Sequence, residues 1–321
     1  MSNPLPSLII GPAIVTWNGY TYYTKAGVKV AFTRDTFKIE TDFDGTIDER
    51  HKSQKATVSL QPVGMVTTLA GMFPYAISMV GKSVFTGTDL PLVIVTKFGG
   101  TGNAGQTITY PRGALTKTPQ LRLKPTDTLF GDLEFTCLGD PTVQPNGATA
   151  WETIASATFA DTSFDETAIT TDIYSAAFGS SPYNAMGSKT GFEIDIELDL
   201  KTIEDDSFGI VDMILAGMTA KAKFVPNNIT QAQFATLLAY QNTGYIYPGQ
   251  SVSKSNTDLV ITGSGNLGTG HTLTATIKNA GPKMGTYMYG VDKHRLEAIE
   301  FTSKRTWTSG AANALFTLAA A

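Results

Sequence analysis

The segment Asp42-Phe43-Asp44-Gly45-Thr46 carries two carboxylates at a spacing that phosphoryl transfer can use. In phosphatases with an Asp-x-Asp-Gly-Thr motif, the first carboxylate is the nucleophile and the second moves a proton. That chemistry requires the motif at the end of a buried parallel strand, whose sequence is continuously apolar. Residues 37–41 instead alternate apolar and polar side chains, and helical crossovers are missing around them. We therefore expect an acidic strand that enters a turn, and a protein that is not an enzyme.

Other reactive residues do not gather into a catalytic or metal-binding pattern. Gly263–Gly270 contains Gly-x-Gly-x-x-Gly without the helix that a dinucleotide site needs, so a loop between two strands is expected. The three histidines, His51, His271 and His294, lack metal-ligand spacing, and the single cysteine, Cys137, is expected to be a buried apolar residue. The acidic stretch lacks the spacing of a calcium loop, which leaves only an irregular structural calcium site open. No cofactor is expected.

Alternation of apolar and acidic residues is the clearest local pattern. In Phe192–Leu200 every second residue is apolar, so the intervening acids line one face of a strand. A similar alternation runs through Phe37–Asp44. Like charges on one strand face repel, so the face must be solvated or paired with cations. The predicted acidic rows consist of Glu40, Asp42 and Asp44 in the first stretch, and of Glu193, Asp195, Glu197 and Asp199 in the second.

The two acidic stretches belong to a longer internal repeat. Phe37–Asp44 matches Phe192–Asp199, 155 positions later, and Leu133–Thr136 matches Ile299–Thr302, 166 positions later. Because the matches keep their order while the offset changes, we expect two diverged copies of one β-rich domain. The expected divisions are an N-terminal arm over 1–12, a first domain over 13–140, a linker or insert over 141–166 and a second domain over 167–321.

Composition agrees with a turn-rich, mainly β protein. The chain has 321 residues, enough for two domains of ordinary size, with 42% hydrophobic and only 16% charged residues. The net charge of −4 argues against a surface that binds nucleic acid tightly. No apolar run is long enough for a membrane span, and the N-terminus lacks the features of a signal peptide. We therefore expect assembly in a cytoplasm and no membrane partner.

Two short helices and a series of strands are predicted in this framework. Asn18-Gly19 indicates a type I′ turn in a hairpin over Ala13–Tyr23, and strands are expected at Val28–Phe32 and Phe37–Asp44. The polar run Asp44–Lys55 is expected to be a long loop before a return strand at Ala56–Leu60. The helices are expected at Val66–Met72 and at Ile229–Tyr240, the second with Thr230 as N-cap. The remaining strands are expected at Leu92–Phe98, Gln106–Tyr110, Gln120–Lys124, Gly131–Leu138, Leu259–Thr262, Thr272–Lys278, Thr286–Tyr289 and Leu296–Thr302.

These residues together resemble the major tail tube proteins of phages with long non-contractile tails. The resemblance covers roughly 13–140 and 165–307 and rests on the duplicated strands, the flanking helices and the long polar excursion. It implies two tandem β-sandwich or partly closed barrel domains, each flanked by one short α-helix. It further implies a virion protein that forms trimeric, pseudo-hexameric rings, stacked into a hollow tube for DNA.

The resemblance also assigns roles to particular residues. The two acidic rows given above would line the lumen, and the excursion would contact the next ring. That inter-ring loop includes Asp48, Glu49, Arg50, His51, Lys52 and Lys55. The implied partners are other copies of the chain, a tape-measure protein, tail-tip or terminator proteins, and phage DNA in transit without tight binding.

A β-sandwich module that decorates a virion or binds carbohydrate is the alternative. Such a module predicts a cluster of exposed aromatic side chains, for which Tyr20, Tyr22 and Tyr23, or Tyr245 and Tyr247, are the candidates.

Overall fold

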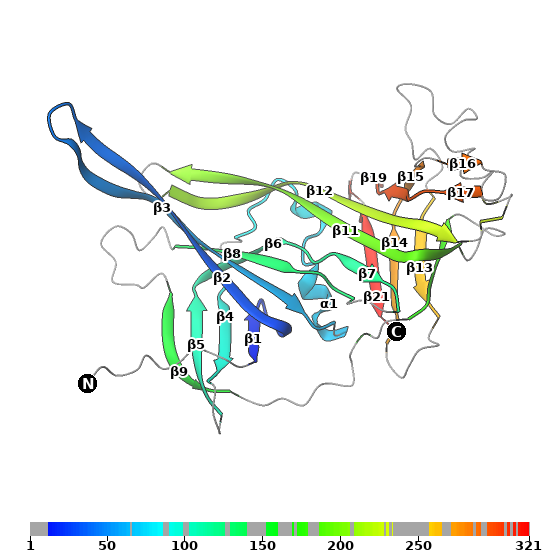
Figure 1. Cartoon of the computed structure of the whole chain (residues 1–321), viewed down its shortest axis with the longest axis horizontal. Helices are drawn as coiled ribbons and strands as arrows, with labels where there is room; N and C mark the ends of the chain where they lie inside the picture. Colours follow the sequence, from blue (N-terminus) through cyan, green and yellow to red (C-terminus); the bar gives the residue numbers. More distant parts are fainter. Residues whose placement is uncertain are drawn as a thin grey trace.

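The computed structural model shows a mainly β protein of antiparallel sheets, with one short α-helix among the residues that it describes (Figure 1). The structure describes residues 12–64, 66–85, 90–98, 103–125, 129–139, 152–159, 169, 172–178, 186–205, 209–227, 229–230, 233, 257–264, 271–284, 287–289, 294–304, 307–308, 311–312 and 314–320. The mainly β class expected from the sequence is confirmed.

The first sheet has eight strands in the order β6-β8-β3-β2-β1-β4-β5-β9. Its strands are β1 (Ala13–Trp17), β2 (Tyr20–Thr41), β3 (Gly45–Pro62), β4 (Leu92–Lys97), β5 (Ala104–Tyr110), β6 (Arg112–Lys117), β8 (Leu133–Leu138) and β9 (Thr153–Thr158). Between β3 and β4 lie the helix α1 (Val66–Met72), as predicted, and a 3-10 turn η1 (Ile77–Met79).

The second sheet has the order β15-β18-β12-β11-β10-β13-β14-β21, with β7 added beside β11. Its strands are β7 (Leu121–Leu123), β10 (Tyr174–Phe178), β11 (Met186–Asp205), β12 (Gly209–Asn227), β13 (Leu259–Gly263), β14 (Leu273–Ile277), β15 (Gly281–Met284), β18 (Ile299–Thr302) and β21 (Phe316–Ala320). Two small ribbons pair β16 (Tyr287–Tyr289) with β17 (His294–Leu296), and β19 (Trp307–Thr308) with β20 (Ala311–Ala312).

The two sheets have the same order of strands. Replacing β1, β2, β3, β4, β5, β6, β8 and β9 by β10, β11, β12, β13, β14, β15, β18 and β21 converts one order into the other. In both sheets the chain order of these strands is also preserved. The division into two tandem domains remains a prediction.

Each sheet contains one long hairpin, called here the first hairpin (β2–β3) and the second hairpin (β11–β12). Both bend at a glycine of positive φ near the base, Gly27 (φ 84°) and Gly191 (φ 87°), a conformation that disfavours side chains with a Cβ. Both end near another such glycine, Gly45 and Gly209. Figure 1 shows the distal end of the first hairpin projecting beyond both sheets.

The irregularities of the two hairpins match at a constant offset. The pairing of β2 with β3 shifts register between positions 24 and 28, 35 and 36, and 39 and 40. The pairing of β11 with β12 shifts between 188 and 192, 199 and 200, and 203 and 204. Each of these positions in the first hairpin, and each of its two glycines, recurs 164 residues later in the second hairpin. Bulges redirect a strand locally, so three shared shifts give both hairpins the same course.

This offset corrects the alignment of the acidic stretches. Phe192 follows the bend at Gly191, and the residue that follows the bend at Gly27 is Val28, not Phe37. The two offsets, 155 and 164, differ by an odd number, which exchanges the two faces of a strand. The match of Leu133–Thr136 with Ile299–Thr302 is consistent with the structure, because these segments are β8 and β18.

The polar excursion over Asp44–Lys55 is not a loop. Gly45–Lys55 belongs to β3 and pairs along β2 as far as Thr41, so the turn is only Asp42–Asp44. Likewise, the two strands predicted over Val28–Phe32 and Phe37–Asp44 are one continuous strand. A polar two-stranded ribbon has no buried face to generate a clear alternation, which explains why its strand character was missed.

Aromatic side chains form matching centres in the core beneath each sheet. Phe135 on β8 lies 5.3 Å from Trp17 and 5.8 Å from Tyr22 between ring centroids. Phe301 on β18, the counterpart of Phe135, lies 5.0 Å from Phe178 and 5.9 Å from Phe224. All six side chains are almost completely buried.

Two further predictions concern the linker or insert and the second helix. Thr153–Thr158, within the linker or insert predicted over 141–166, forms β9 and pairs with β5 of the first sheet. Most of the helix predicted at Ile229–Tyr240 lies outside the described residues. Its predicted start is described: the Thr230 amide donates to Gln233 Oε1 (2.8 Å), and the Gln233 amide donates to Thr230 Oγ1 (3.2 Å). These reciprocal bonds are those of a capping box.

Candidate functional site

The acidic row on β11 lies on the solvent side of the second sheet. Glu193, Glu197 and Asp199 are exposed and Asp195 is half-buried, while the intervening Phe192, Ile194 and Ile196 are buried. The alternation predicted for Phe192–Leu200 is therefore confirmed for these residues. Their neighbours on the adjacent strands decide the electrostatic character of the face.

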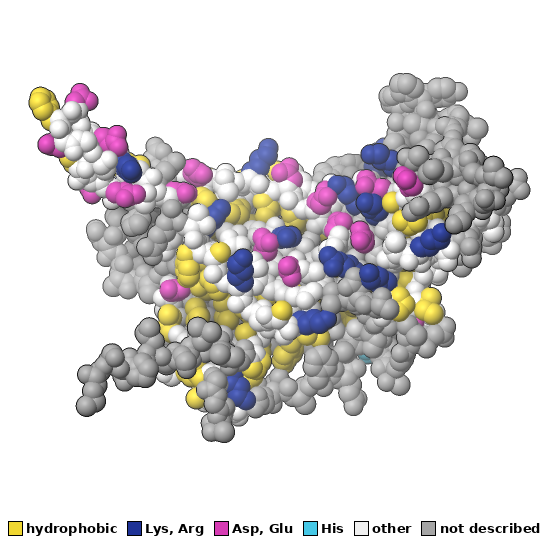
Figure 2. Space-filling view, viewed as in Figure 1, with side chains coloured by type: hydrophobic (Ala, Val, Ile, Leu, Met, Phe, Trp, Pro, Cys, Tyr) yellow, Lys and Arg dark blue, Asp and Glu magenta, His cyan; other side chains and the backbone are white. Residues whose placement is uncertain are grey.

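Basic residues on both adjacent strands balance this acidic row. Glu193 pairs with Arg122 of β7 on one side and with Lys223 of β12 on the other. Lys223 in turn pairs with Glu300 of β18, which pairs with Lys283 of β15. Directly paired residues share one face of a sheet, so the charges alternate in sign across five strands. Figure 2 shows acidic and basic side chains interspersed over this face.

A second basic residue on β12 contacts the acidic row directly. Lys221 lies opposite Asp195 and donates to both carboxylate oxygens of Glu197, each at 2.7 Å. This hydrogen bond raises the pKa of the Lys221 ammonium, partly opposed by its desolvation. The face is consequently charge-balanced, and it is not the uniformly negative surface that the sequence of β11 alone predicts.

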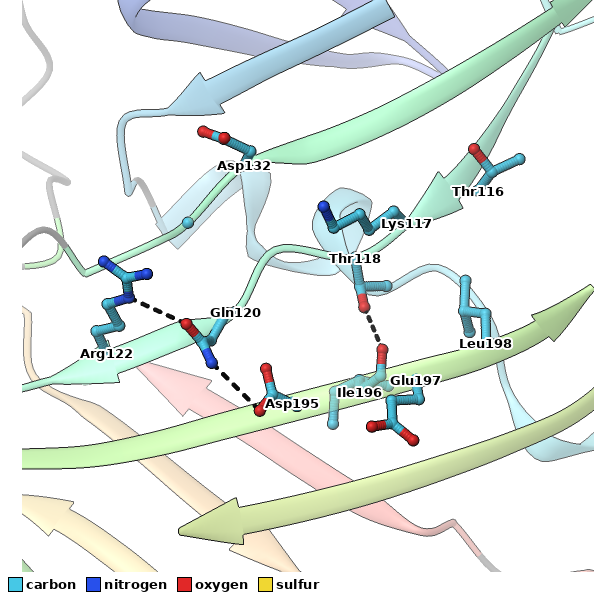
Figure 3. A pocket seen from close by; sticks show the side chains of 11 residues that line it. Thr116, Lys117, Thr118, Gln120, Arg122, Asp132, Asp195, Ile196, Glu197 and Leu198 are labelled. Atoms are coloured by element: carbon cyan, nitrogen blue, oxygen red, sulfur yellow. Dashed lines mark hydrogen bonds between the residues drawn. The ribbon is translucent and has the colours of Figure 1, made fainter. Parts of the chain in front are cut away.

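An open hollow of about 580 Å³ lies where β6, β7 and the β6–β7 connection approach β11 (Figure 3). Gln120 bridges its floor: the side-chain amide donates to Asp195 Oδ2 (3.2 Å), and its oxygen accepts from Arg122 Nε (3.0 Å). Thr118 donates to the carbonyl of Ile196. The residues from 116 to 132 belong to the first half of the chain, so this hollow marks a contact between the halves.

Replacing Asp195 with asparagine is expected to raise the stability of the protein at pH 7, by less than about 1 kcal/mol. Burial raises the pKa of the Asp195 carboxyl, and the Gln120 hydrogen bond only partly opposes this. Because the folded state holds the proton more tightly, stability falls as pH rises through the folded pKa. The gain should therefore shrink as the pH falls towards about 4. Urea unfolding at several pH values measures it.

Glu193→Gln is the matched control, because Glu193 is exposed and flanked by two cations. Replacing this exposed carboxylate should change the stability at pH 7 by less than about 0.5 kcal/mol. An Asp195→Asn variant that loses stability at pH 7 would contradict the assignment of burial as the dominant cause.

The predicted first acidic row is at the tip of the first hairpin. Glu40 lies near the end of β2, where Thr46 donates to its carboxylate (3.0 Å), and Asp42 and Asp44 lie in the turn. All three are exposed. The positions of β2 that correspond to the β11 row are Lys29, Ala31, Thr33 and Asp35. The acidic face is thus not repeated between the two sheets.

The residues of the predicted inter-ring loop lie on β3 of the same hairpin. Asp48, Glu49 and Arg50 are exposed, and the Arg50 guanidinium lies 3.2 Å from Asp48 Oδ2. Lys52 is the extra residue of a bulge, and Lys55 pairs with Thr33 of β2 and with Leu138 of β8. His51 pairs in backbone register with Thr36. The predicted contact residues therefore share one two-stranded ribbon.

The catalytic-looking motifs lie in settings that the sequence predicted. Asp42–Thr46 comprises the turn between two antiparallel strands and the start of β3, and Phe43 in the turn is 99% exposed, a geometry unlike the end of a buried parallel strand. Gly263 ends β13, which pairs antiparallel with β14, as a hairpin requires. Cys137 is fully buried, and burial raises the pKa of its thiol. Among the described residues, no three metal-ligating side chains cluster.

The three tyrosines of the first sheet that the carbohydrate-binding alternative relies on do not form an exposed cluster. Tyr22 is fully buried, and Tyr20 packs against the core. Tyr23 is half-buried on β2. Tyr245 and Tyr247 lie outside the described residues.

The sequence pattern did not identify several basic residues that balance the charge of this surface. Lys221 and Lys223 lie on β12, which was not predicted as a strand, although their two-residue spacing is the strand period. Arg122 was placed on a strand, but nothing in one sequence indicates which strand of the other half it joins.

No helix among the described residues is long and apolar enough to cross a membrane. The chain matches no protein-family model, and no curated protein shows significant similarity to its sequence.

Proposed function

We propose that this chain is a structural subunit that assembles with copies of itself into trimeric, pseudo-hexameric rings. The rings stack into a hollow tube for the passage of DNA, as in the tails of long-tailed phages. The observation that carries the proposal is the pair of sheets with one strand order and one set of hairpin irregularities. Two copies of one domain per chain supply six similar units from three chains.

The first hairpin supports a role in assembly. Beyond the bulge at Lys52 it has no further strand beside it among the described residues, and isolated two-stranded ribbons are only marginally stable in water. Its outer part exposes Phe37, Phe43 and Ile47. Large apolar side chains grouped on a projecting element are typical of surfaces that contact another protein. Contact with a neighbouring subunit, in the same ring or in the next, would cover them.

The balanced charges on β11 and β12 change the electrostatic part of this proposal. A lumen lined by two acidic strands per chain would repel DNA strongly. The residues of β11 offer a mixed surface instead, and the first-hairpin acids are concentrated at one tip. We propose that DNA would pass such a surface because it offers no unpaired row of cations to hold phosphates.

Electron microscopy of the purified protein tests the proposal. The expected result is hollow filaments or stacked rings, formed alone or with a tape-measure protein as template. Monomers under all conditions, or filaments without a lumen, would contradict it. Binding of a glycan by a monomer would favour the decoration or adhesin alternative.

A further inference from the structure

The two halves of the chain are joined by a strand pairing, β7 with β11. The equivalent edge of β2 in the first half has no such partner strand among the described residues. β7, from the first half, pairs antiparallel with β11 of the second: Leu121 with Ile194, Arg122 with Glu193, and Leu123 with Phe192. The equivalent positions on β2, 164 residues earlier, are Val28, Lys29 and Val30. Beyond Tyr23, the described part of the chain places β3 beside β2 on one edge only.

The second half contains a counterpart of β7. Leu121 pairs with Phe130 through an isolated bridge, and Tyr287 of β16 pairs with Leu296 of β17. Leu121 and Phe130 thus correspond to Tyr287 and Leu296, each 166 residues later, which is also the offset between β8 and β18. β16 is therefore the equivalent of β7. In the described residues it pairs with β17 alone.

The buried residues beneath β7 lack the same cover in the first half. Phe192, Ile194 and Ile196 are buried, and Ile196 is 5% exposed. Their counterparts Val28 and Val30 are only partly buried, and Phe32 is 51% exposed. The space around Gly191 is likewise filled by the first half of the chain, whereas the space around Gly27 is open. A Cβ at Gly191 would come within 2.6 Å of Lys124 Cβ, whereas nothing lies within 4 Å of one at Gly27.

We propose that β16 of one chain pairs with β2 of a second copy, in the register in which β7 pairs with β11. Val28 would lie opposite Tyr289, Lys29 opposite Met288, and Val30 opposite Tyr287. This inference rests on the proposed self-assembly and names its interface. The contact is head-to-tail, and such contacts build a closed ring when the rotation per subunit closes.

A second edge is available to the same neighbour. The edge of β12 over Asp212–Leu215 binds the first half: the Leu215 amide donates to the Lys82 carbonyl (3.0 Å), and Ser83 donates to Asp212 Oδ1 (2.6 Å). The equivalent edge of β3 is Asp48–His51, which the described chain leaves without an adjoining strand. Asp48–His51 were predicted to contact the next ring. In this interface they would instead contact a neighbouring subunit of the same ring.

The backbone directions select a pair of positions for cross-linking. The Arg122 amide donates to the Leu129 carbonyl (2.8 Å), away from β11, so Leu121 and Leu123 direct their backbone groups towards β11. Arg122 and Glu193 thus form a non-hydrogen-bonded pair, whose Cα atoms lie about 4.5 Å apart in antiparallel sheets. Disulfides accept that separation. Lys29 and Met288 occupy the equivalent pair in the proposed contact.

The test is the double variant Lys29→Cys/Met288→Cys, oxidised with oxidised glutathione and analysed on non-reducing gels beside electron micrographs. We expect covalent dimers and trimers in the assembled protein and none after reduction. Arg122→Cys/Glu193→Cys is the positive control and should close within one chain. Ala31→Cys/Met288→Cys, two positions out of register, and the single variants are the negative controls.

The outcomes separate this inference from the proposed function. Hollow tubes without the 29–288 cross-link, while the 122–193 control closes, would overturn the interface and leave the tube intact. Cross-linked oligomers without a lumen would support the interface and overturn the tube. If the protein neither assembles nor cross-links, both are overturned.

Discussion

Replacing Phe135 with alanine is expected to lower the free energy of unfolding by about 3–5 kcal/mol. The Phe135 ring is fully buried on β8, between β3 and β6, and contacts the rings of Trp17 and Tyr22. Removing it loses apolar burial and both ring contacts, and leaves a cavity that the two flanking strands cannot fill without moving. Urea unfolding followed by tryptophan fluorescence measures the loss, since Trp17 lies beside the substituted ring.

Two further alanine variants calibrate this expectation. Phe301→Ala removes the counterpart ring from β18 and should produce a loss of similar size, because Phe301 is equally buried between Phe178 and Phe224. Phe37→Ala removes the same side chain from the exposed part of the first hairpin and should change stability by less than about 0.5 kcal/mol. A loss below about 1 kcal/mol for Phe135→Ala would contradict the packing of the first sheet.

Short-range chemistry made some elements predictable from sequence. Asn18 and Gly19 both have positive φ in the turn between β1 and β2, as the type I′ turn requires. The helix Val66–Met72 has its predicted bounds, and several strands with a buried face, such as Leu92–Lys97, lie within a residue or two of their predicted ends. In each case a local pattern, either a turn dipeptide or a periodicity, carries the information.

Relations between strands were not accessible in the same way. β12 was missed because Ala216–Ala222 contains small residues, glycine and lysine with little strand propensity, and it is held by β11 and β18. The balance of charge on β11 depends on Lys221 and Lys223, which approach only through that pairing. A single strand sequence shows which residues share a face but not which strand lies beside it.

The register of the repeat was misjudged for a related reason. Apolar–polar alternation repeats every two residues, so many offsets give a plausible match between two strands. The offset of 155 matched composition, whereas 164 matches the glycine bends and the bulges. A bend of this kind is indicated in the sequence only by a glycine, and a bulge often by no particular residue.

The two bend glycines provide the second large effect. Gly191→Ala is expected to lower the free energy of unfolding by about 2–5 kcal/mol, and Gly27→Ala by about 1–2 kcal/mol. Both substitutions place a Cβ on backbone of nearly the same φ, 87° and 84°, so both incur similar backbone strain. Only at Gly191 would the new Cβ also approach Lys124 Cβ to 2.6 Å and the Leu123 carbonyl oxygen to 3.1 Å.

The backbone strain is similar in the two variants. The difference between their losses of unfolding free energy therefore measures how tightly β7 packs on β11. Urea unfolding of the two variants beside the parent protein gives it directly, and equal losses would show that β7 moves away easily. Below the concentration at which the protein assembles, Gly27→Ala should lose only the unfolding free energy that the backbone strain costs, because the new Cβ meets no neighbouring atom. The same comparison repeated on assembled protein should narrow the difference, because a neighbouring β16 would then lie where β7 lies beside Gly191.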